Sequence, residues 1–427
     1  MEHQNLNRIE DFRQLKTEIR NSRRHLIIGI DIAKDRHHAF FGTPYGQTIL
    51  RRLIFENTRQ GFENLLAVTD SHLKSNGLDI PVFALEPTGN YHKPLGEFLI
   101  RRGCHVVLTS GVAVHRNREL LDGRWDKNDT KDAANVADLV SQGKFLFYDF
   151  PCREVREIQG LTSLKIKLKK LEHGLKVRIR NHLAAVYFPE LDKYCVQSSA
   201  LSLSIIRQMM NPRHIADMEF GVFCQRATDR DRGLRQQQRL EAIYQAARSS
   251  IGCLFTEAAD FEARMMVDNL RRIREEIKRT DAMILKFAKR LSSYEYLLTI
   301  PGFGPDISAK VVAAIGNPDR FESYRQVLKL AGLDLSAARS GKTSDAARPV
   351  LSKRGKSYLR YALYQAALVA STRNIHFMRW MANQLQGREK ERGIKTKMRV
   401  KLAAKMLVIA WTIMKNREPF DPKYLGM

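Results

Sequence analysis

The chain has 427 residues, of which 44% are apolar and 28% charged, and its formal net charge at pH 7 is +26. This composition predicts a folded protein of about two to four domains and excludes wholesale disorder and the secreted and collagenous classes. An excess of cations on this scale predicts a polyanionic partner, first of all nucleic acid, bound with a steep salt dependence.

Three further features narrow the class of protein. Five widely spaced cysteines without a CxxC pair predict a reduced, cytoplasmic protein with neither a zinc cluster nor a disulfide framework. Residues 1–24 are too polar for a signal peptide. The most apolar C-terminal stretch, residues 402–414, contains Lys405 and is too short to span a bilayer, so no membrane association is expected.

The first 150 residues predict an α/β domain. Residues 1–24 are expected to form a polar helical extension, and Leu26–Ile32 is a continuous apolar run typical of a buried strand. The elements expected next are a hairpin over 38–55, a helix over 58–73, a strand over 81–85, a helix over 91–101 and a strand over 104–108. Strands alternating with helices predict a central sheet in a domain over residues 25–150.

Beyond residue 150 the hydrophobic period becomes helical. One seam with heptad spacing comprises Leu161, Leu164, Leu168, Leu171 and Leu175, and a second comprises Met266, Leu270, Ile273, Ile277, Thr280, Ile284, Phe287 and Leu291. They predict a coiled-coil helical domain over 151–296, formed within one chain or between two subunits. Ordinary packed helices are the alternative. Residues 190–257 predict shorter helices, and residues 297–427 a mostly helical C-terminal domain.

Four acidic residues are candidate metal ligands. Asp31 ends the first strand and Glu86 follows another, where open α/β sheets carry functional groups. Asp129 and Asp132 lie three residues apart at an expected helix start, on nearly one face. Buried carboxylates are costly unless they are paired or bind a cation. The four therefore predict a catalytic site with one or two Mg²⁺ ions acting on a phosphodiester. A helix N-cap is the alternative for Asp129, and a turn residue for Asp31.

Two C-terminal motifs are candidate nucleic-acid contacts. Residues 298–312 contain Gly302 and Gly304 between two apolar segments, which predicts a helix–hairpin–helix element that binds phosphate through backbone amides. The alternative is a structural helical turn.

The second motif is built around Ser340, which predicts a nucleophile facing a phosphate. The cations expected to bind phosphate near it are Arg339, Lys342, Lys353, Arg354 and Arg360. An unreactive basic loop is the alternative for this motif.

Together these motifs resemble the DEDD-type transposases of bacterial insertion sequences, specifically the RNA-guided serine recombinases of the insertion-sequence one-ten family. The N-terminal resemblance rests on segments 29–34, 86–89 and 127–133, and the C-terminal one on segments 301–304, 331–333, 340–341 and 352–360. It implies a RuvC-like domain with an RNase H fold, a coiled-coil linker and a C-terminal transposase domain. It also implies that Asp31, Glu86, Asp129 and Asp132 form the metal-binding quartet, and that Ser340 forms a covalent link to DNA.

The same resemblance implies partners and a location. A multimer (dimer or tetramer) would act on donor and target DNA, paired by a structured noncoding guide RNA, in a bacterial cytoplasm in association with the nucleoid. Leu335 departs from the family's proline, and residues 190–257 match no motif. Two alternatives stay open: a RuvC-like nuclease or junction resolvase that forms no covalent intermediate, and a non-catalytic nucleic-acid-binding protein.

Overall fold

The computed structural model describes residues 2–122, 129–194, 200–228, 233–336 and 349–426. The chain forms two compact units, which are described separately. Unit 1 comprises Met1–Cys152 with Asp319–Glu322, and unit 2 comprises Arg153–Pro318 with Ser323–Met427. Within the described residues, no helix is long and apolar enough to cross a membrane. The four-part division at residues 24, 150 and 296 stays a prediction.

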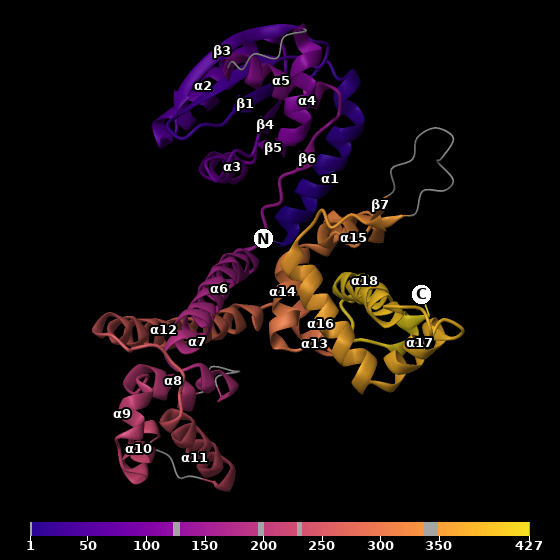
Figure 1. Ribbon diagram of the computed structural model, residues 1–427. Coiled ribbons are helices and arrows are strands. Elements are labelled where there is room, and N and C mark those ends of the chain that lie inside the picture. Colours follow the sequence, from indigo (N-terminus) through magenta and orange to yellow (C-terminus); the bar gives the residue numbers. More distant parts are fainter. Residues whose placement is uncertain (1, 123–128, 195–199, 229–232, 337–348, 427) are drawn as a thin grey trace, which may run out of the picture. The chain divides into compact units, whose positions relative to one another are not determined.

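Unit 1 is built on a mixed six-stranded sheet in the order β3-β2-β1-β4-β5-β6 (Figure 1). Its strands are β1 (His25–Asp31), β2 (Arg36–Gly42), β3 (Thr48–Glu56), β4 (Ile80–Leu85), β5 (His105–Leu108) and β6 (Leu146–Phe147). β1, β4 and β5 are parallel, whereas β2 runs antiparallel to β1 and β3, and β6 runs antiparallel to β5. This confirms the predicted α/β domain and is consistent with an RNase H-like fold.

Helices cover both faces of this sheet. They are α1 (Glu2–Glu18), α2 (Arg59–Asn76), α3 (His92–Arg101), α4 (Gly111–Asp122) and α5 (Asp129–Ser141). α2 and α3 pack on the face that carries Ile28 and Ile30, while α1, α4 and α5 pack on the face that carries Ile27. Because β1 is buried on both faces, its sequence is a continuous apolar run.

α1 packs onto unit 1 and does not extend from it. Ile9, Leu15 and Ile19 are buried, and the last two belong to the core under α5. The segment is helical, as expected, and it packs against the sheet. Its composition is polar overall, but a few apolar side chains on one side of the segment are enough to hold it against the sheet.

The described part of unit 2 is helical apart from two short strands, β7 (Leu335–Ser336) and β8 (Val350–Leu351), which pair antiparallel. Its helices are α6 (Arg153–Arg178), α7 (Ala185–Tyr187), α8 (Ala200–Gln208), α9 (Pro212–Ala216), α10 (Phe220–Ala227), α11 (Leu234–Arg248), α12 (Glu257–Ala288), α13 (Ser292–Leu298), α14 (Pro305–Ile315), α15 (Tyr324–Ala331), α16 (Ser357–Arg373), α17 (Ile375–Leu385) and α18 (Ile394–Asn416). The helical C-terminal region is thus as predicted.

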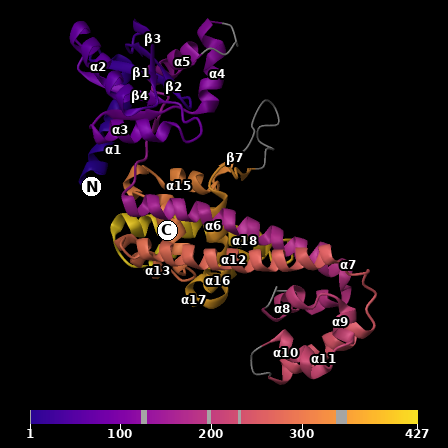
Figure 2. The ribbon, with the colours of Figure 1, turned by 90° about the vertical axis from the view of Figure 1, so that its left-hand side faces the viewer.

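The long helices α6 and α12 lie along one another (Figure 2). α12 buries Leu270, Ile273, Ile277, Thr280 and Ile284, which all belong to its expected seam. At one end of this pair, α8–α11 surround a separate core that includes Phe188 and Phe223. The shorter helices expected between the two seams are therefore present.

Two positions of the seam expected on α6 are not buried within this chain. Leu164 is 46% exposed and Leu171 is 57% exposed, whereas the neighbouring Lys165 and Glu172 side chains are 12% and 7% exposed. Lys165 Nζ contacts Asp281 of α12 at 2.5 Å and Asp306 of α14 at 2.6 Å. Because ion pairs satisfy these buried charges, polar residues take positions that the heptad pattern assigns to leucine.

Candidate active site

Asp31 and Glu86 lie side by side at one edge of the sheet. β1 and β4 are parallel with Ile30 opposite Leu85, so the next residues along are Asp31 and Glu86. The Glu86 backbone amide donates to the Ile30 carbonyl at 3.4 Å, which extends the pairing to this point. Both side chains are half-buried. The structure therefore brings the two predicted strand acids together.

Alternation along the strands sets the face on which these acids lie. Ile27 and Gly29 share a face with Asp31, while Val82 and Ala84 share one with Glu86. Ile27, Val82 and Ala84 pack in the core that contains α5. Both carboxylates thus belong to the face of the sheet that α5 covers.

Gly29 allows α5 to approach β1 closely. A Cβ atom on Gly29 would lie 2.2 Å from the Ala133 carbonyl oxygen and 2.6 Å from the Ala137 amide nitrogen. Any larger residue in this position would push the helix off the strand. Gly29 thereby sets the height of α5 above the strand that ends in Asp31.

α5 runs antiparallel to β1. Its C-terminal end lies near Arg20, which precedes β1, because Arg20 Nε donates to the Gln142 carbonyl at 3.0 Å. Its first residue, Asp129, therefore lies toward the strand end that carries Asp31. The side chain of Asp129 lies outside the described residues. The backbone nevertheless places the first turn of α5 toward the sheet edge that carries Asp31.

Asp132 is engaged by an arginine that the sequence analysis did not identify. Its side chain is 3% exposed, and Arg118 of α4 donates to Oδ1 from Nε at 2.8 Å and from Nη2 at 2.7 Å. A buried carboxylate needs such a partner. No sequence signal marked Arg118, because it lies on a different helix in a chain with many other arginines.

A polar network joins α4 to α5 beyond this ion pair. Asn117 Nδ2 donates to Asn135 Oδ1 and to Asp138 Oδ2, both at 2.7 Å. Asn135 Nδ2 donates to the Val114 carbonyl at 2.6 Å. Asp138 is thus a structural residue of the helix pair. These buried hydrogen bonds fix the rotation of α5 relative to α4.

The start of α4 lies against Glu86. A Cβ atom on Gly111 would lie 3.0 Å from Glu86 Oε1, so glycine leaves room for this carboxylate. α4 therefore contacts one strand acid at its N-terminus and holds Asp132 through Arg118 further along. α4 thus contacts both Glu86 at the sheet edge and Asp132 on α5.

One histidine of β2 lies beside Asp31, and its neighbour faces the other side of the sheet. His38 lies directly opposite Asp31 in the antiparallel register of β1 and β2, so their side chains share a face. His37 is fully buried, and its Nδ1 accepts from the Ala33 amide at 3.3 Å. Burial lowers the pKa of His37. No sequence motif marks His38, which only the register of β1 and β2 places opposite Asp31.

The donor chemistry of this edge suits a hard divalent cation. Carboxylate oxygens are the ligands that Mg²⁺ takes, and Asp31 and Glu86 are adjacent on one face. Over the side chains that the structure describes, no group of three or more potential ligands is close enough to hold a metal. Asp132 is bonded to Arg118, and the carboxylate of Asp129 lies outside the described side chains.

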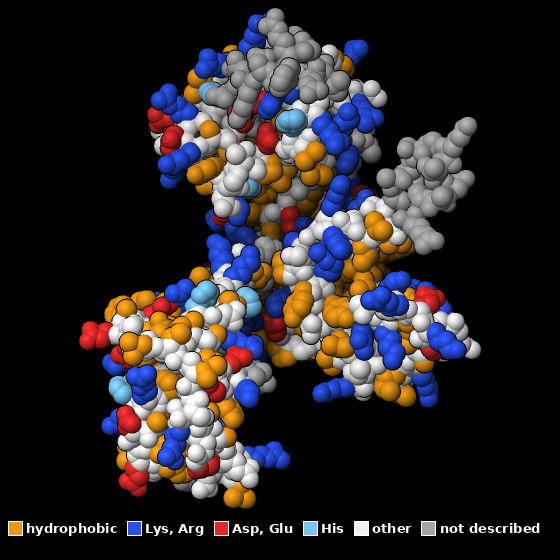
Figure 3. Space-filling view, viewed as in Figure 1, with side chains coloured by type: hydrophobic (Ala, Val, Ile, Leu, Met, Phe, Trp, Pro, Cys, Tyr) orange, Lys and Arg blue, Asp and Glu red, His pale blue; other side chains and the backbone are white. Residues whose placement is uncertain are grey.

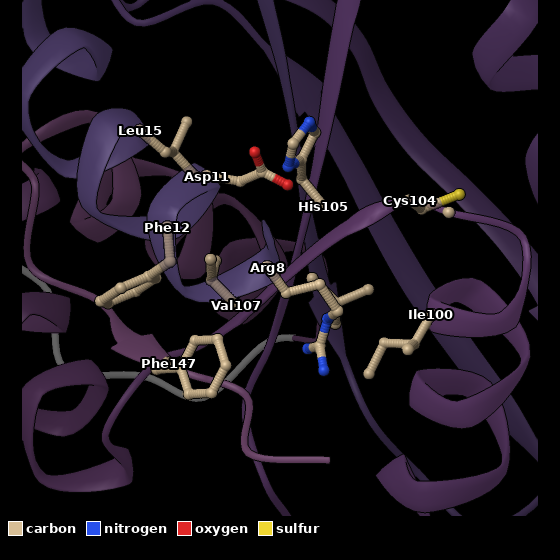
Figure 4. Close-up of a pocket in the computed structure, with 11 residues that line it drawn as sticks. Arg8, Asp11, Phe12, Leu15, Ile100, Cys104, His105, Val107 and Phe147 are labelled. Atoms are coloured by element: carbon tan, nitrogen blue, oxygen red, sulfur yellow. The ribbon is translucent and has the colours of Figure 1, made fainter. Parts of the chain in front are cut away.

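A cavity of about 50 Å³ lies at the opposite end of the parallel strands. It is lined by α1 residues, including Arg8 and Asp11, and by His105 at the start of β5. In Figure 4 the Asp11 carboxylate and the His105 ring face one another, and Arg8 points toward Phe147. This volume is well below that of a ligand pocket, roughly 300 Å³ or more, so the cavity is no substitute for the acidic edge.

The glycines of the expected helix–hairpin–helix turn have different surroundings. Gly302 has φ +90°, and a Cβ there would lie 2.4 Å from the Ala366 carbonyl of α16, so packing alone requires a glycine. Gly304 precedes α14, and a Cβ there would meet nothing within 4 Å. Asp306 lies in the first turn of α14 and forms ion pairs with Lys165 of α6 and with Lys310, each at 2.6 Å. Of the two glycines, only Gly304 presents open backbone.

The serine-containing segment lies between β7 and β8. Ser340, Arg339 and Lys342 are outside the described residues. Of the other predicted cations, Lys353 and Arg354 are exposed, and Lys353 has an unusual φ of +52°. Arg360 Nη1 donates to the Ala331 carbonyl at 2.7 Å, so at least part of its role is structural.

The chain matches two transposase family models, one at each end. A transposase model of the DEDD type named for IS110 matches residues 28–189, and a model described as transposase IS116/IS110/IS902 family matches residues 294–381. The pilin gene-inverting proteins of Moraxella lacunata and Moraxella bovis are each 28% identical over 93% of this chain and 98% of their own length. An uncharacterised 44.8 kDa protein of insertion element IS116 from Streptomyces clavuligerus is 23% identical over 92% of this chain and 96% of its own. The chain therefore belongs to the IS110/IS116/IS902 family of transposases.

Proposed function

We propose that this protein is the transposase of an insertion sequence, a site-specific DNA recombinase that cuts and rejoins DNA with a Mg²⁺-binding acid site and a serine nucleophile, guided by a noncoding RNA. Family membership implies a DNA substrate and a divalent metal. The observation that carries the proposal is the register of β1 and β4, which places Asp31 and Glu86 together under the helix that begins at Asp129.

Asp31, Glu86, Asp129 and Asp132 would hold the metal. When bound, Mg²⁺ polarises a phosphodiester and offsets the charge that develops during its cleavage. β1 and β4 hold two carboxylates at fixed spacing, and Gly29 holds α5 close to them. Asp132 joins the site when its carboxylate leaves Arg118. The freed guanidinium is then available to a phosphate oxygen, which suits its geometry.

The serine step is assigned to Ser340. Its hydroxyl oxygen would attack a DNA phosphorus, the leaving strand would depart with its oxygen, and a phosphoserine link would remain. Arg339, Lys342, Lys353, Arg354 and Arg360 would bind DNA or RNA phosphates around it. Ser352, a neighbouring alternative, already donates its hydroxyl to Asp334 Oδ1 at 2.5 Å. The assignment to Ser340 rests on the resemblance of segment 340–341 to the family motif and not on this contact.

Backbone contact with nucleic acid is assigned to the Gly302–Gly304 turn as a helix–hairpin–helix element. Gly304 is the more open position, because a Cβ there would meet nothing within 4 Å. We retain the remaining expectations as parts of the proposal: a RuvC-like domain over 25–150, a coiled coil over 151–296 and a transposase domain over 297–427. A homo-oligomer, dimer or tetramer, is supported by Leu164 and Leu171, which lie exposed along α6. A cytoplasmic, nucleoid-associated location accords with nucleic-acid partners.

Recombination is preferred to simple hydrolysis because relatives that match along nearly their whole length are named for inverting a pilin gene. Inversion requires rejoining of DNA ends, which a nuclease or junction resolvase does not perform alone. A non-catalytic binding protein would not need carboxylates placed together at a sheet edge.

A cellular recombination assay on the element's own ends tests the proposal. Asp31→Asn, Glu86→Gln and Ser340→Ala should each abolish the joined product. Asp35→Asn, an exposed carboxylate four residues from Asp31, and Ser336→Ala, an exposed serine four residues from Ser340, are the matched controls. Full activity of the first three variants would overturn the proposal. Loss of joining with continued cutting in Ser340→Ala would instead favour the nuclease.

A further inference from the structure

The end of unit 2 that carries α17 and α18 is strongly basic. Residues 379–401 contain eight Lys and Arg and two Asp and Glu, a net charge of +6 over 23 positions. The whole chain reaches only +26 over 427 residues. In Figure 3 the blue side chains gather over these two helices. The second matched family segment ends at residue 381, so most of this stretch lies beyond it.

The acids of this stretch leave most of its cations unneutralised. Glu391 is held by Arg388, whose Nε and Nη2 donate at 2.8 and 3.0 Å, and Glu389 Oε1 accepts from the Gly387 amide at 3.1 Å. Four exposed cations form no ion pair within 4 Å in the described parts of the chain: Lys390, Arg392, Lys395 and Lys397. Of these, Lys397 lies near enough to Glu391 to help Arg388 lower the pKa of that carboxyl. We call these four the α18 basic patch.

A small hydrophobic core next to the patch packs α17 against α18. Met381 of α17 packs with Ile394 and Met398 of α18, and Lys401 Nζ donates to Gln384 Oε1 at 2.6 Å across the two helices. The first turn of α18 contains no acid, so the positive end of the helix dipole adds to the side-chain charge. Lys395 and Lys397 thus lie on a packed helix, and Lys390 and Arg392 lie in the turn that joins α17 to α18.

On α12, by contrast, the exposed cations are paired with acidic residues of the same helix. Arg264 pairs with Asp260 at 2.7 Å, Arg272 with Glu276 at 4.0 Å, and Lys278 and Arg279 both lie within 4 Å of Glu275. Each of these exposed cations has an acid one helical turn away, as on an ordinary solvated helix face. The α18 basic patch lacks such acids, and like charges held together this way favour binding of a polyanion.

We infer that the α18 basic patch is a binding surface for the phosphate backbone of DNA outside the catalytic site. The inference rests on the DNA substrate of the proposed function and adds a location to it. Lys395 and Lys397 sit on the first turn of α18, and Lys390 and Arg392 precede it by a few residues, so the four can follow a run of phosphates without reading bases. The patch then contributes to the affinity for DNA and to the orientation of the DNA on the protein. The base sequence is recognised by other parts of the complex.

The test compares two quadruple variants of the full-length protein that lose equal charge. One is Lys390→Gln, Arg392→Gln, Lys395→Gln and Lys397→Gln, and the control is Arg264→Gln, Arg272→Gln, Lys278→Gln and Arg279→Gln. Fluorescence anisotropy measures their affinity for a labelled DNA duplex of arbitrary sequence over a range of salt, in EDTA so that no DNA is cut. Thermal unfolding confirms that both variants are folded.

The patch variant should bind duplex DNA at least about tenfold more weakly. Its negative slope of log K against log salt should become shallower by about 0.9 for each phosphate that the variant no longer neutralises. The α12 variant should keep nearly the parental slope. An unchanged patch variant, or an equal weakening in both variants, would overturn the inference. The assay measures binding without cleavage. Its result therefore tests the patch even if the protein proves not to be a recombinase.

Discussion

Arg118 of α4 and Asp132 of α5 form a nearly buried ion pair, with two guanidinium nitrogens at 2.7 and 2.8 Å from a single carboxylate oxygen. Asp132 is also one of the four proposed metal ligands. Its carboxylate cannot serve the arginine and a metal ion in full at once. Arg118 stabilises the buried Asp132 carboxylate, and in the proposed metal site it would compete with the ion.

Replacing Arg118 with glutamine should tighten metal binding. The change removes the competing cation but keeps a side chain of similar polarity, so Asp132 becomes available to Mg²⁺. We expect at least about a tenfold gain in Mg²⁺ affinity by isothermal titration calorimetry. In EDTA the same variant should be less stable by about 3 kcal/mol, because a buried carboxylate loses its partner.

Arg116→Gln is the matched control, since Arg116 is an exposed arginine on the same helix. It should leave Mg²⁺ affinity unchanged. Adding Asp132→Asn to Arg118→Gln should remove the gain. Equal Mg²⁺ affinity in Arg118→Gln and the parent protein would show that Arg118 and the metal do not compete.

Gly29→Ala should destabilise unit 1 and impair catalysis together. The added methyl group would lie 2.2 Å from the Ala133 carbonyl, so α5 must move away from β1. A loss of about 3 kcal/mol in the free energy of unfolding is expected from overpacking. Urea unfolding and the recombination assay measure the two effects.

The control for this change is Gly160→Ala in α6, an exposed helical glycine with open space around it. That variant should gain about 0.5–1 kcal/mol from helix propensity. If Gly29→Ala kept both its stability and its activity, the close contact between α5 and β1 would not be needed to position the acids.

The α6–α12 pair should lose stability at acidic pH. Burial raises the pKa of the Glu172 carboxyl, but hydrogen bonds from Lys176 and Lys169 outweigh burial and lower the pKa to about 2. The folded-state pKa is below the unfolded value, so Glu172 stabilises the fold above about pH 4.5 and this contribution disappears as pH falls toward about 2. Its size is at most about 3 kcal/mol.

Glu172→Gln should therefore destabilise the protein at pH 7, and the difference from the parent should shrink steadily below pH 4.5. Glu275→Gln on α12 is the control, because Glu275 is exposed and paired only within its own helix. Urea unfolding across pH gives both curves. A destabilisation by Glu172→Gln that did not vary with pH would contradict the assignment.

The exposed leucines of α6 should matter for assembly. Leu164→Glu with Leu171→Glu should shift a multimer toward monomer in sedimentation velocity, because charges would replace apolar contacts between subunits. Ser163→Glu with His173→Glu, at exposed positions of the same helix, should not. Unchanged assembly in the leucine variant would place the subunit interface elsewhere.

The centre of unit 1 could be predicted because β1 and β4 are short apolar runs, one ending in an acid and the other followed by one. The run before Asp31 and the run before Glu86 both form parallel strands, so adjacency followed from topology. Arg118 could not be predicted, since its partner lies on another helix and the two are 14 residues apart in a chain rich in arginine. β6 was missed because only two residues form it.

In unit 2 the heptad pattern does not match burial within the chain where charge replaces leucine. Lys165 and Glu172 take buried positions through ion pairs with side chains far away in sequence, such as Asp281 and Arg274. Leu164 and Leu171 are exposed as a result. Periodicity measures apolar spacing alone and carries no information on these long-range partners.

The most direct test asks whether a covalent protein–DNA bond forms, and at which residue. The full-length protein is incubated with Mg²⁺, the element's DNA junction and its flanking noncoding RNA, then denatured and digested for peptide mass spectrometry. The account predicts a DNA adduct on Ser340 that is absent from Ser340→Ala and Asp31→Asn. Cleaved DNA without any adduct would contradict it and show hydrolysis in place of serine recombination.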